Sequence, residues 1–251
     1  MGSKVQVFDH TSYCPNFEHG LSRYPIPWKN SDDVKMYRCT LKAGCIWEPP
    51  LYSIQEYFQF FFFLNKTGYV TTTFRAYNVD DYAMFIPNFD HGRFVLHAGA
   101  QDMEFIHILG EINHIDRRKM RASRFVLPRF VRMCDAWNYT EDFNEQAGSS
   151  NVSYSLNNGR RLGRYTVGGN RAFGPDFVGT HAHPTLTQWY LMLDGSDFIY
   201  MAGDEKIPVK AGDVTFTPMG TAHGSLCGAG QQIYYFWFEV NHAWDDDPIE
   251  E

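Results

Sequence analysis

The sequence lacks a hydrophobic run that could cross a lipid bilayer, because its longest apolar stretch extends only from Phe60 to Leu64. It begins without an apolar signal region. Runs of basic residues are short, at 117–119 and 160–161, and the net charge is -7. The positive surface that nucleic acids require is therefore missing. We expect a cytoplasmic protein that binds neither membranes nor nucleic acids.

Cysteines are few, and long helical periodicity is hard to find. No Cys-x-x-Cys motif occurs among the five cysteines, which are Cys14, Cys39, Cys45, Cys134 and Cys227. An odd number without that spacing indicates reduced thiols. Aromatic residues, in contrast, make up 17% of the chain, with 21 Phe and 15 Tyr. This abundance favours β-structure over a helical bundle.

Short apolar and aromatic runs recur along the chain, separated by Gly, Pro, Asn and Asp. Such runs are typical of strands and turns. We expect strands at 57–64, 69–77, 82–86, 188–193, 197–201, 214–217 and 233–240. One helix is expected within 135–146. This density of short strands predicts an all-β sandwich or barrel.

Two parts of the sequence are similar to each other. Residues 59–68 match 188–195, and residues 85–92 match 216–224. The paired Gln, Pro and His residues of these segments lie 129, 131 and 132 positions apart. A nearly constant offset indicates a duplicated domain, with chance among common residues as the competing explanation.

The duplication divides the chain into five expected parts. These are an N-terminal arm (1–30), a first copy (31–100), a connector (101–149), a second copy (150–244) and an acidic tail (245–251). We expect the tail to be solvated. The long arm and the aromatic-rich sheets are compatible with a homodimer.

The second copy contains three histidines and a glutamine at spacings that suit a metal site. Two of them, His181 and His183, are two residues apart and can face the same side of a strand. Gln188 can return on the next strand after a turn at Pro184, and His223 follows a Pro–Gly turn. Neutral imidazoles bind Zn, Fe, Ni, Cu or Mn, and an amide oxygen is a harder partner. We predict one divalent metal ion, with Mn, Fe or Zn favoured and Ni or Cu as further options.

This arrangement resembles the two signature motifs of the cupin superfamily, with two departures. Gln188 stands where the family usually has Glu, and the glycine upstream of the first His is displaced. The resemblance implies two tandem cupin barrels, each a jelly roll or double-stranded β-helix. In the first copy Tyr52 and Ile54 occupy the positions of the two paired histidines, which leaves Gln59 and His91. We expect that copy to be degenerate, metal-free and structural.

A Gln in place of Glu leaves the charge of the metal uncompensated, which favours Lewis-acid chemistry and anionic ligands. A similar three-His-one-Gln set occurs in manganese-dependent hydroxynitrile lyases of the cupin superfamily. We predict a metal-dependent enzyme that acts on a small oxygen-rich or carbonyl substrate as an isomerase, lyase, hydrolase or cyclase. The alternatives are a cupin dioxygenase that uses Fe, Cu, Mn or Ni, and a non-catalytic cupin that binds a small molecule.

Two residues are candidates for a catalytic acid or base. Tyr190 shares the inward parity of Gln188, with a core aromatic as the competing interpretation. Glu239 lies on the last expected strand, where apolar residues on both faces leave its direction open.

Overall fold

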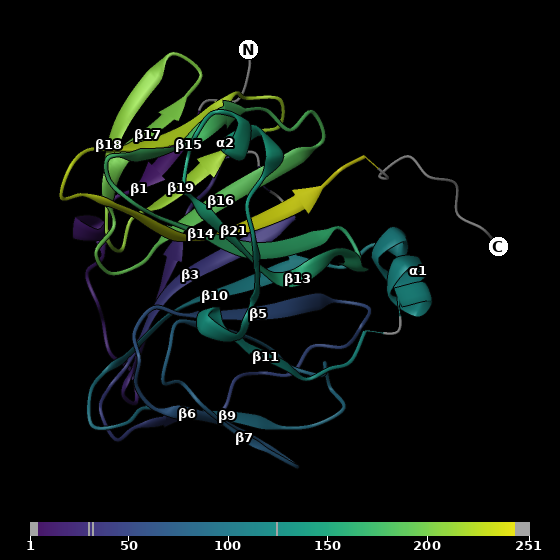
Figure 1. The fold of residues 1–251 in the computed structure, drawn as a ribbon. Coiled ribbons are helices and arrows are strands. Elements are labelled where there is room, and N and C mark those ends of the chain that lie inside the picture. The colour runs from purple at the N-terminus through teal and green to yellow at the C-terminus, as the bar shows by residue number, and fades with distance from the viewer. Residues whose placement is uncertain (1–4, 30, 32, 124, 244–251) are drawn as a thin grey trace. The chain divides into compact units, whose positions relative to one another are not determined.

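The computed structural model describes residues 5–29, 31, 33–123 and 125–243, and the side chains of all of these except 158–160. The chain forms two compact units (Figure 1). The N-terminal unit comprises Thr11–Asp135, and the C-terminal unit comprises Met1–His10 together with Ala136–Glu251. Both units are built mainly from antiparallel strands.

Two sheets form the N-terminal unit. The strands of the larger sheet are β2 (Leu21–Ile26), β3 (Val34–Leu41), β5 (Tyr57–Phe63), β8 (Ala83–Ile86), β10 (Met103–Glu111) and β11 (Arg129–Arg132). Those of the smaller sheet are β4 (Ile46–Trp47), β6 (Tyr69–Thr72), β7 (Ala76–Asn78) and β9 (Phe94–His97). The strand orders are β11-β8-β5-β10-β3-β2 and β4-β9-β6-β7.

The C-terminal unit has the same kind of layers, joined where Asp197 pairs with Gln232. One layer contains β1 (Gln6–Phe8), β12 (Trp137–Tyr139), β13 (Val152–Leu162), β14 (Tyr165–Phe173), β16 (Leu186–Met192), β19 (Val214–Thr217) and β21 (Gln232–Asn241). The other contains β15 (Asp176–His181), β17 (Asp197–Ala202), β18 (Glu205–Lys210) and β20 (His223–Cys227). Their orders are β1-β19-β16-β21-β14-β13-β12 and β15-β20-β17-β18.

The two units share one topology. The order β8-β5-β10-β3-β2 of the N-terminal unit corresponds strand for strand to β19-β16-β21-β14-β13, and β4-β9-β6-β7 corresponds to β15-β20-β17-β18. Even the added edge strands agree, because β11 pairs with β8 and β1 pairs with β19. The all-β class and the duplication predicted from the sequence are therefore confirmed.

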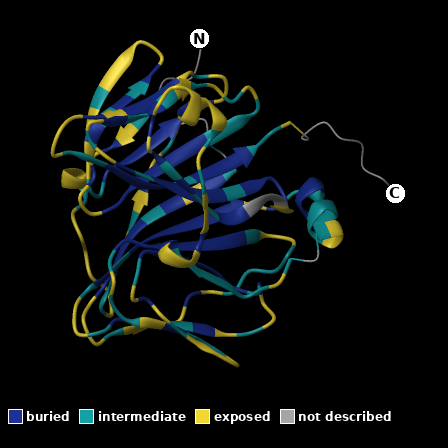
Figure 2. Cartoon of the chain, in the orientation of Figure 1, coloured by how far each residue is buried: buried dark blue, intermediate teal, exposed yellow. Residues whose placement is uncertain are grey.

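Aromatic side chains fill the core of each unit. The strands of both units are largely coloured as buried in Figure 2. In the N-terminal unit Phe61 and Phe63 alternate along β5 into a cluster that also takes in Phe85 and Phe94. The ring centroid of Phe61 lies 5.5 Å from that of Phe94. Each fully buried Phe contributes roughly 1.5–3 kcal/mol relative to exposure. The period-2 pattern of β5 thus ties the larger sheet to the smaller one.

The boundaries of the units differ from those expected. Residues 103–111, assigned to a connector, form β10 in the middle of the larger sheet, where it is the counterpart of β21. The expected arm is divided, because β1 pairs with β19 whereas β2 pairs with β3. The Gln, Pro and His whose spacing identified the repeat all lie within 31–100 in the first copy. The repeat therefore gave no information about the segments outside that range. The acidic tail lies outside the described residues.

Helices are short in this chain. The expected helix within 135–146 is present as α2 (Asp142–Gln146). The chain also contains the 3-10 turns η1 (His10–Ser12) and η2 (Met133–Asp135). A longer helix, α1 (His114–Ser123), was not expected. It is capped reciprocally, because the Asn113 N–H donates to Asp116 and the Asp116 N–H donates to Asn113, each at 3.0 Å. Within the described part of the chain, every helix is too short or too polar to cross a membrane.

Candidate metal centre

Three histidines of the C-terminal unit converge on one point. His181 ends β15 and lies opposite His223, which begins β20. His183 follows two residues after His181, and the ring centroids of the three pairs are 4.5, 4.9 and 5.4 Å apart. One ring nitrogen from each histidine lies within 4.8 Å of the others. These three residues could hold one metal ion, as the sequence predicted.

Two turns bring the histidines together. The turn that precedes His223 contains Gly220, whose φ of 76° is a left-handed conformation that glycine adopts without a steric penalty. The Gly220 N–H donates to the carbonyl oxygen of His183 at 2.8 Å. This bond joins the segment after β15 to the segment before β20, so the spacing of both motifs is needed to assemble the cluster.

Hydrogen bonds fix the tautomers of two of the rings. The Nδ1 of His181 lies 2.8 Å from the carbonyl oxygen of Gly179, and the Nδ1 of His223 lies 2.9 Å from that of Thr221. A carbonyl oxygen can only accept, so both Nδ1 atoms carry the proton. Each Nε2 is left with a free lone pair, which is the form that ligates a metal.

The environment also favours the neutral form of two of the rings. Burial, with a smaller contribution from the nearby His181, lowers the pKa of His183 to about 4. Burial likewise lowers the pKa of His223 to about 4, against the raising effect of its hydrogen bond to Thr221. Neutral imidazoles bind cations without first losing a proton.

Around the three histidines, two buried acceptor atoms lack a hydrogen-bond partner among the described residues: His223 Nε2 in the cluster and Gln188 Oε1 on β16, the next strand along the chain after β15. Most buried polar atoms in proteins are satisfied, so an orphaned pair calls for an explanation. Both are electron-pair donors of the kind that ligate cations. The three clustered histidines therefore fit a divalent metal.

The amide of Gln188 is oriented by the carboxyl group of Glu239, whose direction could not be predicted from the sequence. Its Nε2–H donates to Glu239 Oε1 at 2.7 Å, across the β16–β21 pair in which the two residues are in register. With its nitrogen donating to Glu239, the amide turns its oxygen away from that carboxyl group. Burial raises the pKa of Glu239 to about 8, helped by the charge of Glu141 and opposed by the Gln188 bond.

Tyr190 lies on the same face of β16 as Gln188 and within the core. Its ring centroid is 6.0 Å from that of His223 and 4.1 Å from that of Tyr235, on which it stacks. Burial raises its pKa well above 10, with further contributions from Tyr235. The phenol therefore stays protonated at neutral pH and can donate a hydrogen bond. That Gln188 is a ligand, and that Tyr190 or Glu239 takes part in chemistry, stay predictions.

Sequence reasoning missed the contacts of α2. The Phe143 ring lies 4.7 Å from the His181 ring, and the buried Asn144 accepts a hydrogen bond from the Gly179 N–H at 2.7 Å. The helix thus packs against the end of β15 that carries the ligands. The sequence indicated a helix here but gave no signal for the strand it would cover.

The corresponding residues of the N-terminal unit are used differently. Gln59 is satisfied at both ends of its amide, since its Nε2–H donates to Pro50 O at 2.9 Å and its Oε1 lies 3.1 Å from His107 Nε2. Tyr52 packs edge-on against Tyr57. His91 is exposed. The orphaned amide oxygen of Gln188 therefore contrasts with its satisfied counterpart.

Searches with the sequence find no matching family profile and no matching curated protein. The fold, in contrast, is shared with solved structures. A Pseudomonas aeruginosa protein described as glyoxylate-induced superposes with a TM-score of 0.74 at 11% identity, over 95% of this chain and 88% of that one. Oxalate decarboxylase from Lactobacillus farciminis, in complex with formate, gives 0.68 at 12% identity over 96% and 87%. A mutant of Bacillus subtilis oxalate decarboxylase gives 0.68 at 12% over 96% and 79%.

The resemblance to these proteins, at such low identity, concerns the fold. It covers nearly the whole chain, which agrees with the strand-for-strand correspondence of the two units. The chain therefore has the all-β fold predicted from the sequence, with two tandem jelly-roll barrels.

Proposed function

We propose that the protein is a metal-dependent cupin enzyme whose C-terminal unit holds one divalent ion through His181, His183, His223 and Gln188. The observation that carries the proposal is the cluster of three histidines, in which the buried Nε2 of His223 has no hydrogen-bond partner in the described part of the chain, as is also the case for Gln188 Oε1. An ion bound there would supply Lewis-acid chemistry, polarising an oxygen atom of the substrate.

Glu239 acts in this proposal as a positioning residue. By accepting from the Gln188 amide nitrogen, it turns the amide oxygen toward the histidines and holds it there. The raised pKa keeps most of Glu239 protonated at neutral pH in the metal-free protein. A bound cation would favour its carboxylate form, which would supply, one residue removed, the negative charge that Gln188 lacks as a ligand. The centre is then less electron-poor than a set of three His and one Gln alone, which departs from the comparison with hydroxynitrile lyases.

Tyr190 and Phe143 complete the proposed site. Tyr190 remains protonated, so it would stabilise a developing negative charge by donating a hydrogen bond, not by accepting a proton. Phe143, against the His181 ring, would limit the access of water on that side. A site of this kind suits an isomerase or lyase that acts on a small oxygen-rich acid or carbonyl compound. Two structural neighbours bear the name oxalate decarboxylase, a lyase activity on a small acid.

The proposal is tested by the metal content of protein purified without added metal. We expect stoichiometric Mn, Fe or Zn in the wild type and its loss in His183→Ala and His223→Ala. The matched control is His242→Ala, because His242 lies in the same unit and contacts Thr187 at 3.1 Å but is not part of the cluster. Full metal in both cluster variants would contradict the assignment.

Turnover then separates the reaction classes. Conversion of small hydroxy acids, keto acids or diketones without oxygen would support the Lewis-acid proposal. Oxygen uptake that depends on iron or copper would favour a dioxygenase. A ligand that binds without any turnover would favour a non-catalytic cupin.

A further inference from the structure

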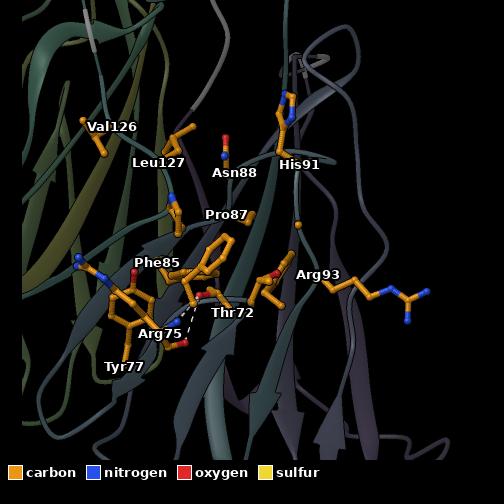
Figure 3. A pocket seen from close by; sticks show the side chains of 15 residues that line it. Thr72, Arg75, Tyr77, Phe85, Pro87, Asn88, His91, Arg93, Val126 and Leu127 are labelled. Carbon is orange, nitrogen blue, oxygen red and sulfur yellow. Dashed lines mark hydrogen bonds between the residues drawn. The ribbon is translucent and has the colours of Figure 1, made fainter.

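A cavity of about 350 Å³ lies within the N-terminal unit, the copy expected to be purely structural. It is lined by the end of β6 and its turn at 72–75, by the strands β7 and β8, by the loop at 87–93 with the start of β9, and by residues 126–128 ahead of β11 (Figure 3). Its volume is at the lower end of the range of small-molecule sites, and too small for a folded peptide segment.

Aromatic rings form the floor of this cavity. Phe85 and Phe94 are almost completely buried, with 0% and 2% of their surface exposed. Their ring centroids are 5.4 Å apart, and that of Tyr77 lies 5.9 Å from Phe85. Tyr77 is held in turn by stacking on Phe130 at 5.2 Å. The floor is thus a rigid apolar surface built into the core.

The charge of the lining is opposite to that of the protein. Among the described residues that line the cavity, the ionisable side chains are Arg75, His91 and Arg93, and none is acidic, although the chain has a net charge of -7. Arg93 extends away from the other labelled residues in Figure 3 and pairs with Glu48 at 3.5 Å. Arg75 has no ion-pair partner in the described part of the chain.

Two unusually exposed apolar side chains border the same cavity. Phe74 is 92% exposed and Val126 is 77% exposed, the highest values among the large hydrophobic residues that the structure describes. Isolated exposed hydrophobic residues are ordinary, but two beside a basic, aromatic cavity mark a surface that a ligand would cover.

We propose that this cavity binds a small carboxylic acid with an aromatic or branched apolar body. Arg75 binds the carboxylate, since a guanidinium matches its planar geometry. The apolar body rests on Tyr77 and Phe85, and Phe74 closes over it. The N-terminal unit is then a ligand-binding domain, in addition to the metal-dependent C-terminal unit. The proposed function does not require this role.

The test uses phenylacetate and 3-methylbutanoate as probes, each compared with its neutral amide, by isothermal titration calorimetry on the full chain. We expect both acids to bind saturably at about 1 mM or below, and the amides to bind about tenfold more weakly. Arg75→Gln should weaken the acids about tenfold and remove their advantage over the amides. Phe74→Ala should weaken acids and amides alike, by roughly threefold to tenfold.

Both substituted residues are exposed, so neither variant threatens the fold. Arg121→Gln is the matched control, because Arg121 is an exposed arginine at the end of α1, outside the cavity. Failure of both acids to bind, equal binding of acids and amides, or an equal loss in Arg121→Gln would each overturn the proposal. Metal content should be the same in all three variants, which keeps this result independent of the proposed function.

Discussion

Replacing Glu239 by Leu tests how the Gln188 amide is held. In the N-terminal unit the residue opposite Gln59 on β10 is Leu109, the counterpart of Glu239. Glu239→Leu therefore introduces at this position the side chain that the other barrel already has. The substitution removes the acceptor that lies 2.7 Å from Gln188 Nε2, and the amide is then free to rotate.

The magnitude follows from the bond that is lost. Because a bound cation would favour the ionised form of Glu239, the bond that is lost is one to a charged group. Such a bond contributes about 1.5–3 kcal/mol, which converts to roughly a 10- to 100-fold change in affinity. Partners of metal ligands typically change metal affinity by that factor. The stability of the metal-free protein should not fall in parallel, because a buried carboxyl is itself costly to desolvate. Affinity and stability should therefore respond differently.

Chelator competition measures the metal affinity, and thermal unfolding of metal-free protein measures the stability. Glu239→Gln serves as the conservative variant, since its amide oxygen can still accept from Gln188 and should restore part of the affinity. Glu205→Gln removes a carboxylate from the exposed start of β18 and is the control for charge alone. If Glu239→Leu bound metal within twofold of the wild type, the positioning role of Glu239 would be refuted.

Three further changes probe the surroundings of the centre. Gln188→Glu should retain metal but alter metal preference or rate, because it places a second carboxyl against Glu239; unchanged preference and rate would count against the electrostatic reasoning. Asn144→Ala should lower the free energy of unfolding by about 1–3 kcal/mol, since Gly179 loses its buried acceptor; an unaltered denaturant midpoint would show that this bond is dispensable. Phe143→Ala should speed metal release measured by stopped-flow chelation, because it uncovers one histidine ring; an unchanged release rate would exclude a covering role.

The repeat and the histidine cluster were accessible from the sequence because both rest on local spacing. The i, i+2 spacing predicted that the two histidines face the same way, although His183 lies two residues beyond the end of β15. The offsets of Gln, Pro and His indicated the duplication. The limits of each barrel were not accessible in this way. β10 completes the N-terminal sheet but carries none of the matched residues, so it was assigned to a connector.

The direction of Glu239 shows a different limit. Its strand, β21, is apolar on both faces because it lies between β14 and β16, and the period-2 pattern that assigns faces is then lost. The register opposite Gln188 depends on pairing across 51 residues of chain. The α1 helix, in contrast, had a readable signal in Asn113 and Asp116, the residues of its reciprocal cap.

Anomalous X-ray diffraction from crystals grown with Zn²⁺ would test the metal centre most directly. We predict one strong peak in the C-terminal unit, about 2.1 Å from a nitrogen of His181, His183 and His223 and from Gln188 Oε1. A peak at another position, or a Gln188 amide oxygen turned away from the ion, would contradict the account.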